Sequence, residues 1–191
     1  DLGITYKDDK SPLTLADKAS NTVIEKGLKI LTPTIPLLSE EGKKIDYKER
    51  EKWNIFWLID PLDGTKEFIK RNGEFTVNIA LISNGEPILG VVYAPVVDTI
   101  WYGSINKGSF KCINNESPVK INSVTPNNSD TIKVVTSRSH ANNPKLDSFL
   151  KDYPNHELIP SVEYEINGLI EYETVIDSLN NIALKTKENN I

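Results

Sequence analysis

A ten-residue stretch, Phe56 to Thr65, constrains this chain more than any other feature. Its first four residues are apolar, as in a buried strand, and an acidic turn with Asp60 and Asp63 follows. Proline cannot donate to a strand ladder, so Pro61 predicts that the chain leaves the sheet there. Gly64 permits a tight turn, and the next six residues have the composition of the first turns of a helix. Carboxylates at a strand end and free N–H groups at a helix start suit divalent cations and a phosphate, so we interpret this stretch as a candidate active site.

The same stretch has a simpler interpretation, because Asp and Gly are ordinary turn residues at the end of a strand. Two other acidic sites are excluded by spacing. An EF-hand loop needs acidic side chains where Leu62 and Gly64 stand. An aspartyl-phosphate enzyme of the haloacid-dehalogenase kind, with the pattern D-x-D-G-T, would need a nucleophilic Asp where Pro61 stands.

Charge and cysteine content limit the partners and the compartment. The net charge is −5 and no basic run exceeds two residues, so we expect no nucleic-acid partner. A single cysteine, Cys112, excludes an intrachain disulfide and favours a reducing compartment, hence the cytoplasm. No apolar run approaches the length of a bilayer span, so no integral membrane segment is expected. The chain has no Met and begins at Asp1, which is typical of a fragment.

The N-terminal third predicts one helix and one short strand ahead of the central stretch. Thr14 is a plausible N-cap, and Asp17 stands three residues later, where a carboxylate favours a helix start. Apolar residues then recur at helical spacing and predict a helix from about 15 to 31: Leu15, Ala16, Ala19, Val23, Ile24, Leu28 and Leu31. Residues 35–38 read as a short strand that leads to Glu40, and the charged segment 42–54 reads as a solvated loop.

The middle of the chain predicts an antiparallel meander. Alternating or β-rich segments span 75–82, 87–93, 99–102 and 110–113, with Asn84-Gly85 as a hairpin turn. Residues 114–130 read as a polar loop, 132–136 as a strand and 146–150 as part of a helix. A helix, then many antiparallel strands, then strand and helix again indicates the α+β class.

Three short motifs resemble one enzyme family. The segment Asp60–Thr65 matches the D-P-x-D-G-T signature of the lithium-sensitive, magnesium-dependent phosphatases related to inositol monophosphatase. Ser11–Asp17 and Leu38–Glu41 resemble the two other N-terminal motifs of that family. The longer run Leu58–Leu81 resembles the family's CysQ-type 3′(2′),5′-bisphosphate nucleotidases, and the resemblance extends over about residues 5–160.

The resemblance implies a layered α-β-α-β-α fold. A metal-binding phosphatase domain, largely antiparallel sheet with helices, would occupy residues 1–125, without the family's N-terminal helix. Residues 126–191 would form an incomplete second α/β domain, with an atypical tail from about 162. In that tail Ser161 is followed by Val162-Glu163-Tyr164 where relatives continue with Gly-Ser-Ser-Leu-Lys, and none of the three tryptophans precedes an Asp.

The resemblance also implies roles for individual residues. Glu40, Asp60, Asp63 and the backbone carbonyl of Leu62 would bind two or three Mg²⁺ ions. Thr65 and Asp17 would form a catalytic dyad that orients and deprotonates the attacking water, with Glu40 as a third catalytic residue. The implied substrate-binding residues are Glu40, Leu62, Asp63, Gly64, Thr65 and His140, where the amides of Gly64 and Thr65 would hold phosphate and His140 the nucleotide.

The implied activity is removal of the 3′-phosphate from adenosine 3′,5′-bisphosphate, giving AMP and phosphate by direct attack of a metal-activated water. An inositol or sugar monophosphatase is the alternative within the family. A third hypothesis is a catalytically incompetent fragment, since the late Trp-Asp motif is missing from this chain. A homodimer and peripheral association with the cytoplasmic face of the inner membrane complete the expectations.

Overall fold

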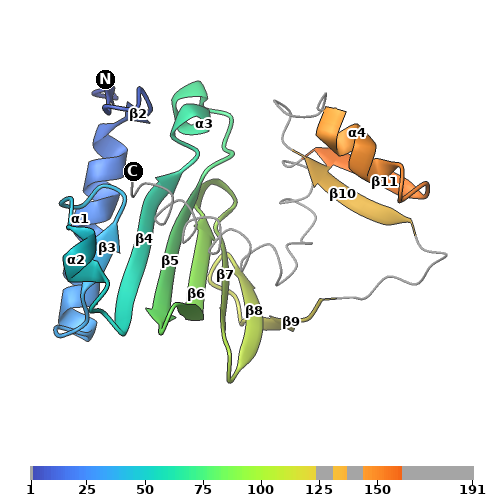
Figure 1. Cartoon of the computed structure of the whole chain (residues 1–191). Coiled ribbons are helices and arrows are strands. Elements are labelled where there is room, and N and C mark those ends of the chain that lie inside the picture. Colours follow the sequence, from blue (N-terminus) through green and yellow to red (C-terminus); the bar gives the residue numbers. More distant parts are fainter. Residues whose placement is uncertain (1, 124–130, 137–143, 161–191) are drawn as a thin grey trace. The chain divides into compact units, whose positions relative to one another are not determined.

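The computed structural model describes residues 2–123, 131–136 and 144–160 (Figure 1). Its contacts divide the chain into two compact units, and the described parts lie in residues 2–121 and 122–160 respectively. The first unit carries the motifs at residues 11–17, 38–41 and 60–65. The tail from 162 and His140 lie outside the described residues.

The predicted first helix is confirmed as α1, Leu15–Leu31. Thr14 is its N-cap and forms a capping box with Asp17, in which each residue's side chain bonds the other's backbone N–H. The buried stripe differs from the predicted one, because Leu15, Val23 and Leu31 are exposed. Polar residues, Asp17 and Asn21, lie on the buried face instead, since this end of the helix adjoins the acidic turn.

The sheet of the first unit has seven strands in chain order, β3-β4-β5-β6-β7-β8-β9. Its strands β3 and β4 pair in parallel and every other pair is antiparallel. The α+β class and the largely antiparallel first sheet are therefore confirmed. The strands are β3 (Leu37–Ser39), β4 (Ile55–Asp63), β5 (Thr76–Ser83), β6 (Glu86–Ala94), β7 (Thr99–Ser104), β8 (Gly108–Ile113) and β9 (Val119–Ile121).

The prediction that the chain leaves the sheet at Pro61 is wrong. Strand β4 continues to Asp63, and its register with β5 shifts between the pairs Asp60–Asn78 and Asp63–Thr76. Two residues of β4 thus lie opposite one residue of β5, which is a β-bulge. A bulge can accommodate a proline because the ladder is locally interrupted there.

Two further elements lie in segments predicted as loops. The charged segment 42–54 contains a single helical turn, α2 (Tyr47–Arg50), which Asp46 caps through a bond from the Lys48 backbone N–H. The polar segment 114–130 contains β9, which pairs with β8 at the sheet edge. Both elements are four residues or shorter, which is too short for a helical or alternating hydrophobic pattern to be recognised in the sequence.

The core lies on both faces of the sheet. On one face Leu28 of α1 packs with Trp57 and Ile59, and Figure 1 shows α1 alongside the β3–β4 end of the sheet. The Trp57 indole N–H also donates to the Thr32 hydroxyl at the end of α1, at 2.9 Å. On the opposite face Leu58, Ala80 and Ile82 form a second cluster. Strand β4 is therefore buried on both sides, in agreement with its unbroken apolar run.

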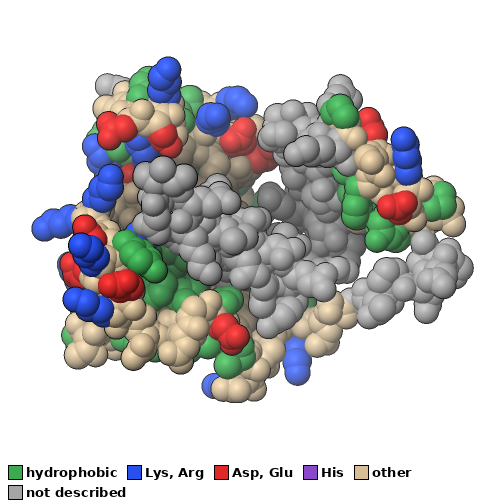
Figure 2. Space-filling view, viewed as in Figure 1, with side chains coloured by type: hydrophobic (Ala, Val, Ile, Leu, Met, Phe, Trp, Pro, Cys, Tyr) green, Lys and Arg blue, Asp and Glu red, His purple; other side chains and the backbone are tan. Residues whose placement is uncertain are grey.

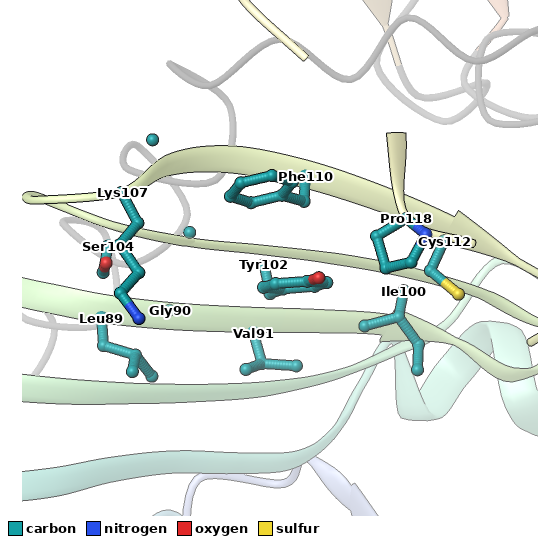
Figure 3. Close-up of a pocket in the computed structure, with 12 residues that line it drawn as sticks. Leu89, Gly90, Val91, Ile100, Tyr102, Ser104, Lys107, Phe110, Cys112 and Pro118 are labelled. Carbon is teal, nitrogen blue, oxygen red and sulfur yellow. The ribbon is translucent and has the colours of Figure 1, made fainter. Parts of the chain in front are cut away.

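The α1 face of the sheet continues into an apolar pocket on β6–β8 (Figure 3). Leu89, Val91, Ile100, Tyr102 and Phe110 line it, and its volume is about 410 Å³. The rings of Tyr102 and Phe110 are stacked with their centroids 5.5 Å apart. On the face shown in Figure 2, Lys and Arg side chains are interspersed with Asp and Glu rather than gathered in one block.

Short elements complete the two units. A two-stranded hairpin, β1 (Thr5–Tyr6) and β2 (Pro12–Leu13), precedes α1, and α3 (Thr65–Lys70) follows β4. A 3₁₀ turn, Pro95–Val97, joins β6 to β7. The second unit contains α4 (Pro144–Leu150) and the parallel pair β10 (Ile132–Thr136) and β11 (His156–Pro160), of which β10 and α4 fall where strand and helix were predicted. Within the described residues, no helix is long and apolar enough to cross a bilayer.

Candidate active site

The parallel pairing of β3 and β4 brings two acidic residues together. Ser39 pairs with Ile59, and the Glu40 backbone N–H donates to the Ile59 carbonyl at 3.0 Å. Because β3 and β4 run parallel in this register, Glu40, which follows β3, lies at the level of Asp60 within β4. The structure thus brings together Glu40 and Asp60, two of the residues that the family resemblance implies as metal ligands.

The bulge after Asp60 is held from two sides. The Ser20 hydroxyl of α1 donates to the Pro61 carbonyl at 2.8 Å, and one Asp60 carboxylate oxygen accepts from the Leu62 N–H at 3.2 Å. Gly64, which follows, has a φ of 93°, and a Cβ there would lie 2.7 Å from the Glu74 carbonyl oxygen. Only glycine fits this turn, which fixes the start of α3 against the start of β5.

A hydrogen bond joins Asp17 and Thr65, the two residues of the predicted dyad. The Thr65 hydroxyl lies 3.1 Å from one Asp17 carboxylate oxygen and 3.3 Å from the Leu62 carbonyl. The other Asp17 oxygen accepts from the Thr14 backbone N–H at 2.8 Å and from the Thr14 hydroxyl. Asp17 is 1% exposed, so the capping box holds a buried carboxylate in one orientation. One carboxylate oxygen of Asp17 thus takes part in the capping box, and the other contacts Thr65.

Asp60 is in an environment that disfavours its charge. Burial raises its pKa most, and the neighbouring carboxylates of Glu40 and Asp63 raise it further, to about 8. A protonated Asp60 also hydrogen-bonds Glu40, while the bond from the Leu62 N–H acts in the opposite direction. Three mutually repelling carboxylates at one strand end are the electrostatic situation that a bound cation would relieve.

Lys7 is a partner of the acidic group that the sequence did not indicate. Its ammonium lies 2.8 Å from a Glu40 oxygen and 2.5 Å from a Glu41 oxygen. Burial lowers the pKa of Lys7, but the bonds to the two glutamates outweigh it and the net shift is upward. Desolvation raises the pKa of Glu41, the better buried of the two glutamates, despite Lys7. The polar lead-in before α1 therefore supplies a positive charge to the site.

Asn78 is the second residue that sequence reasoning missed. It lies on β5 opposite Asp60, is 2% exposed, and its amide nitrogen is 3.4 Å from an Asp63 oxygen. A signal for it was available, because the alternation of β5 places Asn78 on the face of Ala80 and Ile82. A polar residue at a core position of an alternating strand indicates a specific partner.

The carboxylates of Glu40, Asp60 and Asp63 offer oxygen atoms, the kind of ligand that Mg²⁺ prefers. In the parts of the chain that the structure describes, no three or more His, Cys, Asp or Glu side chains are grouped as a cage that could hold a metal ion, and Glu40 pairs with Lys7. Mg²⁺ does not need such a cage, because it is usually bound by one or two carboxylates, with water and substrate oxygens completing its shell. The raised pKa of Asp60 and the all-oxygen donor set fit that ion.

These features define a class of site: crowded carboxylates on a bulged strand end, beside a Thr–Asp hydrogen bond, suited to metal-assisted chemistry on an anionic substrate. The comparisons with known proteins agree with it. The family model described as the inositol monophosphatase family matches residues 1–183, beyond residue 162 where the tail was predicted to become atypical. The chain belongs to the inositol monophosphatase family.

Relatives of known name are similar over most of this chain. The 3′(2′),5′-bisphosphate nucleotidase CysQ of Salmonella typhimurium (strain LT2) is 47% identical over 151 residues, which are 79% of this chain and 58% of that protein. The enzyme of the same name from Escherichia coli (strain K12) is 46% identical over 82% of this chain and 61% of its own length. The crystal structure of CysQ from Bacteroides thetaiotaomicron is 40% identical with a TM-score of 0.65, covering 81% of this chain and 62% of that one. This chain therefore spans about three fifths of the length of these relatives.

Proposed function

We propose that this chain carries the metal-binding half of a Mg²⁺-dependent phosphomonoesterase that removes the 3′-phosphate from adenosine 3′,5′-bisphosphate. The relatives named as CysQ nucleotidases support the substrate class, since they are 46–47% identical over about four fifths of this chain. The observation that carries the proposal is the hydrogen bond between Thr65 and Asp17, next to the crowded acidic strand end.

The chain's own residues would move one proton. Asp17, fixed by its bonds to Thr14, accepts the hydrogen bond of the Thr65 hydroxyl. The Thr65 oxygen can then accept a hydrogen bond from the attacking water and aim it at phosphorus. As the water oxygen bonds to phosphorus and the ester P–O bond breaks, the water's proton passes to Thr65 and the Thr65 proton to Asp17. The leaving ribose oxygen takes its proton from solvent.

Glu40, Asp60, Asp63 and the Leu62 carbonyl would hold Mg²⁺. The ion would supply polarisation of the phosphate and a lowered pKa of water. The N–H groups of Gly64 and Thr65 would bind phosphate oxygens, and the absence of a side-chain cap at the start of α3 supports this role. His140 would contact the nucleotide.

The test is phosphate release by the purified chain with Mg²⁺, using adenosine 3′,5′-bisphosphate beside inositol 1-phosphate and a sugar phosphate. The proposal requires Li⁺-sensitive turnover that prefers the nucleotide and is lost in Thr65→Ala. The matched control, Thr22→Ala, removes an exposed hydroxyl that donates to the Lys18 carbonyl within α1. Preference for inositol or sugar phosphate would favour the alternative specificity. A folded chain without turnover, beside an active longer relative, would show a catalytically incompetent fragment.

Several finer features belong to the same proposal. The site would take two or three Mg²⁺ ions, and the domain boundary would lie near residue 125. A homodimer and a cytoplasmic location, at the inner membrane's cytoplasmic face, are also proposed from the family resemblance. Metal titration, sedimentation and cell fractionation test them separately.

A further inference from the structure

Asn78 occupies a core position between two acidic side chains. The β4–β5 register pairs Asp60 with Asn78 and Leu58 with Ala80, so Asp60 and Asn78 are direct cross-strand neighbours on one face of the sheet. Directly paired side chains of this kind have Cβ atoms about 5 Å apart. The neighbouring pair, Leu58 and Ala80, is part of the apolar core. Packing alone would therefore favour an apolar residue at position 78, where the chain has an amide.

The orientation of the Asn78 amide follows from its contact with Asp63. Its nitrogen lies 3.4 Å from an Asp63 carboxylate oxygen, and an ionised carboxylate can only accept hydrogen bonds. The NH₂ group must therefore face Asp63, and the Asn78 amide oxygen points away from that carboxylate. That oxygen is buried and has no donor in the part of the chain that the structure describes.

A buried amide oxygen without a donor is costly, and such groups usually mark a partner that the protein chain does not itself provide. Water in the hydration shell of a cation is a strong donor, and Mg²⁺ keeps several such waters when bound by carboxylates. We infer that Asn78 is a positioning residue of the metal site, whose amide nitrogen orients Asp63 while its oxygen accepts a hydrogen bond from a cation-bound water. This inference rests on the proposed function, because it deepens the same site.

A purely structural role makes different predictions. If Asn78 only ties β5 to the bulge, replacing it changes the stability of the sheet and leaves cation affinity alone. If it positions Asp63 and a hydration water, replacing it weakens cation binding even when the fold is intact. Groups outside the immediate ligand shell typically contribute about 10- to 100-fold to metal affinity.

The experiment compares Asn78→Leu with the wild-type chain by calorimetric titration with Mg²⁺ and by electron paramagnetic resonance with Mn²⁺. Leucine has the branching of asparagine at Cγ and removes both the donor and the unsatisfied acceptor; because it is bulkier, thermal stability in EDTA is measured beside cation affinity to show that the variant is folded. We expect the affinity for both ions to fall by about 10-fold or more. Ile82→Ala is the control, since Ile82 lies on the same strand and face, and this change lowers stability without altering cation affinity.

Each outcome is decisive. Wild-type affinity in a folded Asn78→Leu chain would overturn the inference and leave the proposed metal site standing. An equal loss of affinity in Ile82→Ala would also overturn it, because general loosening of the sheet would then explain the result. If Asn78→Leu does not fold, Asn78→Ala provides the same comparison. If the wild-type chain binds neither ion, the proposed function fails at its metal site, and the inference fails with it.

Discussion

Replacing Asp60 by Asn is expected to make the metal-free chain more stable and to remove its response to Mg²⁺. Asp60 is 8% exposed and its carboxyl is repelled by Glu40 and Asp63, which together with burial raise its pKa to about 8. Asparagine resembles the protonated acid in shape. Its amide nitrogen can donate to Glu40 and its oxygen can accept from the Leu62 N–H, as Asp60 does.

The sign of the pH dependence follows from the direction of the shift. Between pH 3.8 and about 8 the unfolded chain has released a proton that folded Asp60 still holds, so stability falls as the pH rises through this window. At pH 7 the accumulated cost is on the order of 4 kcal/mol, at about 1.4 kcal/mol per pH unit. For a unit of this size that corresponds to a melting temperature lower by roughly 15 °C. A bound cation replaces the proton, so stabilisation by Mg²⁺ grows with pH in the same window.

The assay is thermal unfolding of the wild-type and Asp60→Asn chains at pH 5, 7 and 9, in EDTA and in excess Mg²⁺. In EDTA we expect the variant to melt higher at pH 7 and 9, with a smaller dependence on pH. In Mg²⁺ the wild-type chain gains stability and the variant does not. Asp8→Asn removes the same charge at an exposed position and is the control. Equal melting of wild type and variant in EDTA at pH 9 would refute the reasoning.

Three further substitutions test separate parts of the site. Thr65→Ala should lower kcat by about 10²- to 10⁴-fold, because it removes the proton path to Asp17. Calorimetry should find the Mg²⁺ affinity unchanged. An unchanged kcat would exclude the dyad. Gly64→Ala should destabilise the chain by about 1–3 kcal/mol in urea unfolding, since the turn needs a positive φ and has no room for a Cβ; wild-type stability would contradict this. Lys7→Gln removes the ammonium that pairs with the half-buried Glu41. Mg²⁺ then meets less competition for the carboxylates, so the Mg²⁺ concentration for half-maximal turnover should fall. A higher Mg²⁺ requirement would instead show that Lys7 holds the glutamates in place.

Long periodic elements could be predicted from the sequence and short ones could not. The bounds of α1 were predicted to the residue, because a good N-cap and a proline soon after its end mark both limits. Its buried face was predicted less well, since apolar residues such as Val23 and Ile30 remain exposed while Asp17 and Asn21 are buried. Hydrophobic periodicity assumes that the core is apolar, and that assumption fails where a helix adjoins an acidic site.

Pairs that are remote in the sequence were accessible only through family resemblance or through the structure. The contact between Asp17 and Thr65 joins residues 48 positions apart, and no local pattern indicates it. Lys7 stands in a polar, breaker-rich segment before α1, and its ammonium contacts two carboxylates. Charge pairing across such distances depends on the register of β3 and β4, which the sequence does not state.

The bulge at Pro61 explains why the acidic turn works as a unit. In a regular strand, residues three positions apart point to opposite faces, so Asp60 and Asp63 would be separated by the sheet. The extra residue of the bulge brings Asp60 and Asp63 to the same face of the sheet. Asp60 pairs with Asn78 and Asp63 with Thr76, and these two partners lie on the same face of β5. Both carboxylates then come close enough for Asp63 to raise the pKa of Asp60 and for Asn78 to contact Asp63. The sequence predicted that the strand ends at Pro61. Pro61 instead lies in the bulge that changes the register of β4, and the hydrogen bond from Ser20 to its carbonyl holds the extra residue in place.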